Sequence, residues 1–301
     1  MISKKEHVGC MFALLTAMTW GLFPILISQY GKNISPIAFA GMSVLVASMA
    51  AFLYMVFQKK LHELKKLSAY KNLFLVTLFI VILPYIFYFP GAIKTSSVNA
   101  SLLLLSEIIF TILFTPLFGE KTTKQKLIGM LGVFFGALCI LYKDNFSFHS
   151  ADLLIIFSTI FYPFGNFYSK KALNDFSPST VLFFRSLVGG LLLLLLSFLF
   201  EHNTSFFQIA NTYALVLLVN GIFLLGVSKI FWYEALKRLD ISKAISLSMT
   251  FPFFSLIVLI LFFDQTFSPS QLLGIGFMAL GAYFSLKRPS VDPEKTKYRA
   301  S

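Results

Sequence analysis

Long apolar stretches separated by short polar connections make up most of this sequence. A helix needs roughly 20 apolar residues to cross the hydrocarbon core of a bilayer. The stretches of this kind are Val8–Ser28, Pro36–Phe57, Asn72–Ala92, Val98–Phe118, Leu127–Tyr142, Ala151–Ser169, Ser179–Phe200, Ala210–Tyr233, Ile241–Phe263 and Gln271–Leu286. Because hydrocarbon offers the backbone no hydrogen-bond partners, such stretches fold as helices. The sequence therefore predicts an all-α integral membrane protein with ten transmembrane helices.

Charged residues are scarce, and almost all of them lie in the connections. They make up 13% of the chain, against about 25% in soluble domains. If the N-terminus faces the cytoplasm, 20 of the 25 Lys and Arg residues fall on the cytoplasmic side, as the positive-inside rule requires. We therefore expect a multi-pass protein of the cell inner membrane with both termini cytoplasmic. The net charge of +12 then reflects topology and contact with lipid headgroups, and we expect no binding of nucleic acid.

The chain starts with an apolar segment and ends with a polar one. The apolar run Val8–Ser28 follows a basic start but is longer than the core of about 7–15 residues found in signal peptides. We expect it to be a retained first span. Residues 289–301 are polar and charged, which predicts a disordered cytoplasmic tail.

The fourth stretch, Val98–Phe118, carries one ionisable residue, Glu107, close to its middle. Burying a charge at this depth costs about 2.5 kcal/mol or more, so such residues usually face a cavity or a partner. We expect Glu107 to line a central pathway, as a proton carrier or as a partner for a substrate amine. The alternative is a structural ion pair with Arg185 or Lys229.

The two halves of the chain echo each other. Ser35-Pro36 recurs as Ser177-Pro178, and the segment Leu127–Ala137 resembles Leu272–Ala282, including two glycines seven residues apart. A third echo relates Gly91-Ala92-Ile93-Lys94 to Glu234-Ala235-Leu236-Lys237. We predict two five-helix repeats, 1–145 and 146–288. Because five is odd, the second repeat enters the membrane from the opposite side, an arrangement common in alternating-access transporters.

Several short motifs, in this order, carry a family resemblance. They are Trp20-Gly21, Ile34-Ser35-Pro36, Thr95-Ser96-Ser97-Val98-Asn99-Ala100, Phe118-Gly119-Glu120, Asn166, Trp232-Tyr233-Glu234-Ala235-Leu236 and Pro252. With these motifs the chain resembles the drug/metabolite transporter superfamily, and within it the EamA-type transporters with ten spans. The resemblance implies a bacterial inner-membrane carrier, often an exporter of amino acids or other small metabolites. It also implies a cavity lined by the first, third, fourth, sixth, eighth and ninth spans.

Polar and aromatic residues within the spans are candidates for binding a substrate beside Glu107. They are Trp20, Tyr85, Tyr88, Tyr162, Asn166, Asn220, Lys229, Ser246 and Thr250. Each has a structural alternative. The amides can hold helices together, the hydroxyls of Ser246 and Thr250 can bond to their own helix, and the aromatic rings can fill the core.

Three other residues lie close enough to the ends of their spans to reach a membrane surface. Arg185 lies about seven residues, or roughly 10 Å of helix rise, inside the seventh span, and we expect it to reach the headgroups. Trp232 is a further candidate for an aromatic-lined pocket. Because Trp232 and Tyr233 lie near the end of their span, the alternative for both is an interfacial aromatic belt. The glycines of the fifth and tenth spans indicate close helix packing, in a scaffold or a homodimer.

No catalytic or metal-binding pattern and no phosphate loop occurs, so we expect no enzyme activity and no cofactor. The sequence predicts a secondary active transporter that exports a small polar metabolite, such as an amino acid, by alternating access around a central cavity. Its partners are then a small-molecule substrate and the lipid bilayer, with proton or exchange coupling. The alternatives are a membrane-embedded lipid scramblase or enzyme, a nucleotide-sugar or cofactor carrier of the same superfamily, and a non-transporting receptor.

Overall fold

The computed structural model describes residues 4–23, 26–27, 34–66, 69–121, 123–141, 149–201, 206–263 and 268–286. The predicted tail, 289–301, lies outside these residues. In the first half, the elements are α1 (Lys4–Trp20), α3 (Pro36–Phe57), η1 (Leu61–Lys65), α4 (Tyr70–Val76), η3 (Thr77–Ile82), α5 (Leu83–Ala92), α6 (Ser97–Leu104), α7 (Ser106–Phe114), η4 (Thr115–Phe118) and α8 (Lys124–Leu141).

The second half of the chain also builds five spans, with a π-helical segment in the third of them. Its elements are α9 (Ser150–Thr159), α10 (Tyr162–Asp175), α11 (Pro178–Phe200), α12 (Phe206–Thr212), α13 (Ala214–Leu218), η5 (Val219–Val227), α14 (Ser228–Leu236), α15 (Ile241–Ser248), α16 (Phe251–Phe263) and α17 (Pro269–Leu286). Seven helical stretches are long enough and apolar enough to cross a membrane. The first, sixth and ninth spans are built from shorter helices: α1, α9 with α10, and α15 with α16. The prediction of an all-α membrane protein with ten transmembrane helices is confirmed.

Equivalent helices of the two halves run antiparallel, as an inverted repeat requires. Glu201, at the end of α11, accepts hydrogen bonds from the first backbone N–H groups of α3, at Ile37 (2.8 Å) and Ala38 (2.9 Å). At the other end of this pair, Glu63 in η1 accepts a bond from the backbone N–H of Ser177, just before α11 (2.7 Å). Glu201 of the second half thus caps the N-terminus of α3, and Glu63 of the first half caps the N-terminus of α11. Both contacts are favourable because a helix N-terminus stabilises a negative charge.

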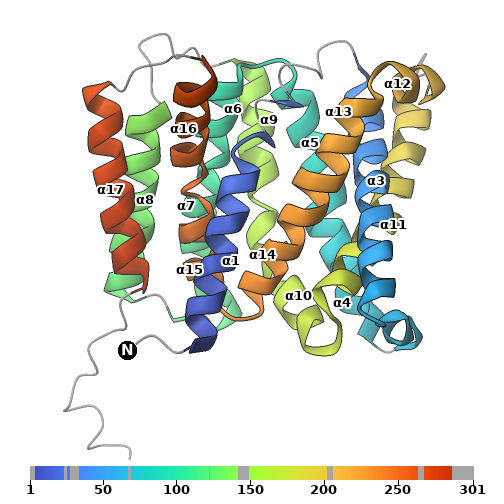
Figure 1. Ribbon diagram of the computed structural model, residues 1–301, viewed down its shortest axis with the longest axis horizontal. Helices are drawn as coiled ribbons and strands as arrows, with labels where there is room; N and C mark the ends of the chain where they lie inside the picture. Colours follow the sequence, from blue (N-terminus) through green and yellow to red (C-terminus); the bar gives the residue numbers. More distant parts are fainter. Residues whose placement is uncertain are drawn as a thin grey trace, which may run out of the picture.

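The fifth helices of the two halves, α8 and α17, form the second antiparallel pair. A Cβ added to Gly136 in α8 would lie 2.6 Å from the carbonyl oxygen of Gly274 in α17. A Cβ on Gly274 would lie equally close to the carbonyl oxygen of Gly136. The close helix packing predicted from the paired glycines is therefore confirmed within one molecule. In Figure 1, the pair α8 and α17 lies on the left side of the bundle and the pair α3 and α11 on the right side.

The helices between these two pairs are irregular at mid-depth, at matching places in both halves. The third and eighth spans contain the π-helical segments η3 and η5. The fourth span breaks at Leu105, between α6 and α7, and the ninth breaks at Met249 and Thr250, between α15 and α16. Such breaks are tolerated inside a membrane where they face protein or a cavity.

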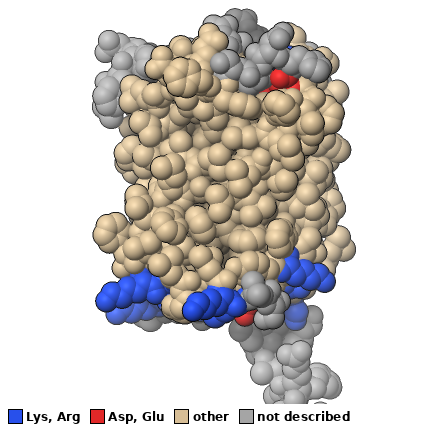
Figure 2. Space-filling model, turned by 90° about the vertical axis from the view of Figure 1, so that its right-hand side faces the viewer, with Lys and Arg blue, Asp and Glu red and all other residues tan. Residues whose placement is uncertain are grey.

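The outer surface of the bundle is apolar between its two ends, as lipid contact requires. Phe57, Phe198 and Leu215 are more than 70% exposed. On the face that Figure 2 shows, Lys and Arg side chains gather at one end, which we call the basic end. The order of the helices assigns to this end Lys4, Lys5, Lys59, Lys60, Lys65, Lys66, Lys71, Lys121, Lys124, Lys126, Lys170, Lys171, Lys237, Arg238 and Lys243, and assigns Lys94 to the opposite end. This asymmetry agrees with the charge pattern from which the orientation is predicted.

Candidate functional site

A cavity of about 60 Å³ lies between the irregular helices. Its lining consists of Thr16, Trp20, Ile80, Tyr85, Leu104, Glu107, Tyr162, Asn166, Arg185, Lys229, Trp232, Ile245, Ser248 and Met249. These residues come from the first, third, fourth, sixth, eighth and ninth spans, as the resemblance implied, and Arg185 adds the seventh. The cavity therefore lies where the two repeats meet.

Glu107 is held on the lining by the break in its span. The backbone N–H of Ile108 bonds to the carbonyl oxygen of Leu105, three residues back, which marks the tight turn between α6 and α7. Glu107 follows this turn and is 7% exposed. Its Oε1 accepts a hydrogen bond from Nδ2 of Asn166 in α10 (3.2 Å). The two residues that stood out in the fourth and sixth spans are thus direct partners.

Lys229 reaches the cavity from the start of α14, directly after the π-helical segment η5. Its Nζ lies 3.3 Å from the centroid of the Trp20 ring, a cation–π contact with the aromatic ring that supports such contacts best. Trp20 stacks in turn on Phe23 (centroids 4.1 Å apart), and Phe23 stacks on Tyr88 (5.5 Å). Tyr88 is therefore behind Trp20 and is not part of the lining.

Arg185 does not lie at the headgroups, where the sequence analysis places it. Instead of reaching the headgroups, it is 2% exposed and lines the cavity. Its guanidinium carbon lies 5.2 Å from the ring centroid of Tyr233 in α14. Nε and Nη1 have no hydrogen-bond partner among the described residues. Depth along the span is the same as expected, but α11 turns this side chain inward toward α14.

Trp232 and Tyr233 lie inside the bundle, so the interfacial belt, the alternative considered for both, does not apply. Trp232 lines the cavity and Tyr233 is fully buried beside Arg185. These residues lie near the end of the eighth span in the sequence, but Leu239 of the following loop packs against the bundle at Gly9 and is 3% exposed. Aromatic side chains near a span end therefore belong here to the wall of the cavity.

The remaining candidates divide into two groups. Tyr85 and Tyr162 line the cavity, as do Trp20 and Lys229. Ser246 and Thr250 do not, because the Ser246 hydroxyl meets that of Ser285 at 2.6 Å and the Thr250 hydroxyl donates to the carbonyl of Leu247 at 2.7 Å.

Asn220 is fully buried in η5 and is not on the lining either. Its side-chain nitrogen and oxygen have no hydrogen-bond partner among the described residues. Two polar lining residues were missed from sequence. Thr16 is four residues before Trp20 and hence on the same helix face, and Ser248 ends α15. Among the residues that the structure describes, no group of three or more His, Cys, Asp or Glu side chains is placed to hold a metal ion.

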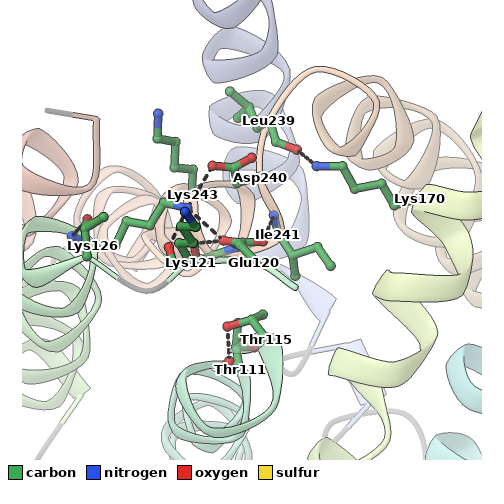
Figure 3. A network of polar contacts seen from close by, with 12 residues as sticks. Thr111, Thr115, Glu120, Lys121, Lys126, Lys170, Leu239, Asp240, Ile241 and Lys243 are labelled. Carbon is green, nitrogen blue, oxygen red and sulfur yellow. Dashed lines mark hydrogen bonds and ion pairs between the residues drawn. The ribbon is translucent and has the colours of Figure 1, made fainter. Parts of the chain in front are cut away.

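A second polar cluster joins the loop after η4 to the start of α15 and includes Lys121, Lys126, Lys170 and Lys243 of the basic end (Figure 3). Glu120, between η4 and α8, accepts bonds from the backbone N–H groups of Ile241 (2.8 Å) and Ser242 (3.2 Å) and from the Ser242 hydroxyl. It therefore caps α15, which belongs to the other half of the chain. We call this contact the Glu120 cap.

Lys126 reinforces the Glu120 cap. Its Nζ lies 3.1 Å from Glu120 Oε1 and 2.8 Å from Asp240 Oδ2. Burial alone would raise the pKa of Asp240, but the hydrogen bond and the charge of Lys126 bring that pKa below its ordinary value. Lys170 of α10 donates to the carbonyl oxygen of Leu239 in the same loop. Four segments of the chain thus meet at this point.

Each half of the chain separately resembles a known protein family. The model of the EamA-like transporter family matches the chain twice, over residues 7–142 and 149–287. The chain belongs to the EamA-like transporter family. The resemblance seen in the sequence motifs is confirmed, and the protein is a transporter.

Relatives of this EamA-like transporter carry related descriptions. The "Uncharacterized transporter YoaV" of Bacillus subtilis is 25% identical over 82% of this chain and 84% of its own length. The "Probable amino-acid metabolite efflux pump" of Escherichia coli is 23% identical over 95% of this chain and 96% of its own length. A solved structure described as "Crystal structure of protein" superposes with a TM-score of 0.75, at 17% identity, over 92% of this chain and 96% of that one. This last similarity supports the fold alone.

Proposed function

We propose that this EamA-like transporter is a secondary exporter of a small polar metabolite, such as an amino acid, across the cell inner membrane. One observation carries the proposal: a buried carboxylate, Glu107, faces a cavity between the two repeats and is surrounded by polar partners. The printed description of the relative from Escherichia coli, an amino-acid metabolite efflux pump, agrees with this substrate class. The basic end would face the cytoplasm. The first residue of α1 and the last residue of α17 lie at this end.

Coupling to protons would follow from the position of Glu107. Asn166 donates to one carboxylate oxygen, and Lys229, Arg185 and Tyr162 line the same cavity. A carboxylate at this place binds either a proton or the amine of a substrate, but not both at once. Outward movement of the substrate would then be exchanged for inward movement of a proton. Exchange between two substrates at the same site is the other form of coupling that this arrangement allows.

Alternating access would use the difference between two kinds of helix cap. The antiparallel pair α3 and α11 is capped at both ends, by Glu201 and Glu63. Neither helix is irregular, so this pair suits a fixed scaffold. The Glu120 cap instead joins the fourth and ninth spans, which are both broken and both line the cavity. We infer that the repeats, 1–145 and 146–288, separate at this cap when the cavity opens to the basic end.

Reconstituted protein would test this proposal. Liposomes loaded with a mixture of amino acids and other small metabolites, with and without a pH gradient, should show gradient-dependent efflux of a subset of them. Glu107→Gln should abolish this dependence, whereas Asp175→Asn, an exposed acid at the end of α10, should behave as the unmodified protein. Efflux by the Glu107→Gln protein with an unchanged response to pH would rule out the assigned coupling role.

A further inference from the structure

Arg185 carries a charge for which the described part of the chain provides no ion pair. The residue is 2% exposed, and its Nε and Nη1 have no hydrogen-bond partner among the described residues. It nonetheless lines the cavity. Burying an unpaired charge is among the costliest arrangements in a folded protein. Ionisable residues kept at this depth of a membrane protein generally serve a ligand or an ion.

The other charges of the cavity do not neutralise Arg185. Glu107 accepts its hydrogen bond from Asn166, and no ion pair joins it to Arg185 in the part of the chain that the structure describes. Lys229 lies over Trp20 and adds a second positive charge. One carboxylate therefore shares the cavity with two cations, Arg185 and Lys229. The cavity has an unmatched positive charge when all three side chains are ionised.

The surroundings of Arg185 hold the guanidinium group ready for an anion. The Tyr233 ring supports it at 5.2 Å, and Tyr85 and Tyr162 contribute aromatic walls beside it. A guanidinium group presents pairs of N–H donors whose geometry matches the two oxygens of a carboxylate. With little water between apolar walls, such a contact is stronger than at a surface.

We propose that Arg185 binds an anionic group of the transported molecule and that this group is a carboxylate. This inference rests on the proposed transport through the cavity and adds the chemical class of the substrate, a compact carboxylic acid. The volume of about 60 Å³ favours a compact acid over a larger phosphate ester. A phosphate group offers the Arg185 guanidinium oxygen acceptors like those of a carboxylate, so the test includes it separately.

The chain provides its own reporter for this site. Its two tryptophans, Trp20 and Trp232, both line the cavity, so intrinsic fluorescence responds to whatever occupies it. Purified protein in lipid nanodiscs would be titrated with L-alanine, L-alaninamide, propionate and inorganic phosphate. We expect a saturable change with L-alanine and with propionate. L-Alaninamide, which lacks the carboxylate, should produce no saturable change.

Variants then assign the effect to Arg185. Arg185→Gln should weaken the binding of L-alanine and propionate by roughly tenfold or more, the usual effect of losing a charged hydrogen bond. Arg185→Lys keeps the charge without the paired donors and should recover part of the affinity. Arg238→Gln is the matched control, because Arg238 pairs with Glu234 outside the cavity and its loss should leave binding unchanged. Elution volume and thermal melting report whether each variant is folded.

Several results would overturn the inference. These are equal binding of L-alanine and L-alaninamide, no fluorescence change with any probe up to its solubility, and unchanged carboxylate binding in folded Arg185→Gln. Tighter binding of phosphate than of either carboxylate would overturn the assignment to a carboxylate. The proposed function can fail separately: protein that binds carboxylates but moves no metabolite across liposomes would refute transport and leave this subsite standing. If Arg185→Gln transports as well as the unmodified protein, the subsite is refuted and the proposed transport function stands.

Discussion

Lys229 and Trp20 form a cation–π contact across the cavity, with Nζ 3.3 Å from the ring centroid. The contact joins the eighth span to the first, and so the second repeat to the first. It also places the lysine over an aromatic face, and no carboxylate lies within ion-pair distance of it among the described residues. Among the described residues, Glu107 therefore has Asn166, rather than Lys229, as the direct partner of its carboxylate, through Oε1.

Weakening the Trp20 ring should destabilise the protein in steps. A desolvated cation–π contact contributes about 2 kcal/mol, and Trp supports it better than Phe. Thermal melting in detergent should thus rank the unmodified protein above Trp20→Phe, and Trp20→Phe above Trp20→Leu. In a Lys229→Met background, the difference between the last two should shrink. Trp232→Phe is the control, since no cation is recorded over the Trp232 ring in the described part of the chain; an undiminished difference in the Lys229→Met background would contradict the assignment.

Removing the charge of the Glu120 cap should favour the state that is open at the basic end. Glu120→Gln replaces charge-assisted bonds to Ile241 and Ser242 with weaker ones, at a cost of about 1–3 kcal/mol. A cysteine placed at Ser248 on the cavity lining, in protein whose Cys10 and Cys139 are replaced by alanine, would be labelled with a membrane-impermeant maleimide.

The measurement is the labelling rate from each side of the membrane, in vesicles of both orientations. We expect Glu120→Gln to raise the rate several-fold from the basic end only. Glu63→Gln, which weakens a cap of the scaffold pair α3 and α11, is the control and should leave the rate unchanged. Equal acceleration by both variants would mean that the Glu120 cap has no special role in opening.

Acid should destabilise the protein partly through Glu63. Burial alone would raise the pKa of Glu63, but bonds from the Ser177 backbone and from the hydroxyls of Thr180 and Ser177, with the charge of Lys60, lower it below the ordinary 4.5. The unfolded chain then binds more protons than the folded protein near this pH. The contribution is therefore present above pH 4.5 and is lost as the pH falls through the lower, folded-state pKa.

The comparison is between melting curves recorded over a range of pH. Glu63→Gln should cost about 1–3 kcal/mol at neutral pH, because hydrogen bonds to a charged group are lost. Its melting temperature should also fall less steeply in acid than that of the unmodified protein. Asp175→Asn controls for the loss of an exposed acid. Parallel pH profiles for Glu63→Gln and the unmodified protein would show that this carboxylate does not contribute to acid sensitivity.

Two glycines of α17 should respond in opposite ways to the same change. A Cβ on Gly274 would meet the Gly136 carbonyl oxygen at 2.6 Å, whereas a Cβ on Gly276 has nothing within 4 Å. Gly274→Ala should therefore push α17 from α8 and destabilise the protein by about 1–3 kcal/mol. Gly276→Ala should be neutral or slightly stabilising, since alanine favours a helix by up to about 1 kcal/mol over glycine. Similar melting temperatures for the two variants would contradict the observed packing.

Part of the candidate site could be predicted because membrane burial makes polar residues conspicuous. Glu107, Asn166 and Lys229 stand out in apolar runs, and all three line the cavity. Asn220, Ser246 and Thr250 stood out for the same reason but lie off the lining. Arg185 was assigned to the headgroups from its depth and because the family resemblance does not place the seventh span at the cavity, although its side chain points to the cavity. Depth can be counted along a span, but direction cannot.

The sequence by itself determined the number of spans, the repeat and the charge asymmetry, because these depend on lengths and on local composition. The tertiary structure decided which side of each helix faces the cavity. A helix that is apolar on every side has no polar stripe to indicate its inner face, so its rotation is set by packing against its neighbours. That packing brings Lys229 over Trp20, turns Arg185 inward and seats Glu120 on the start of α15.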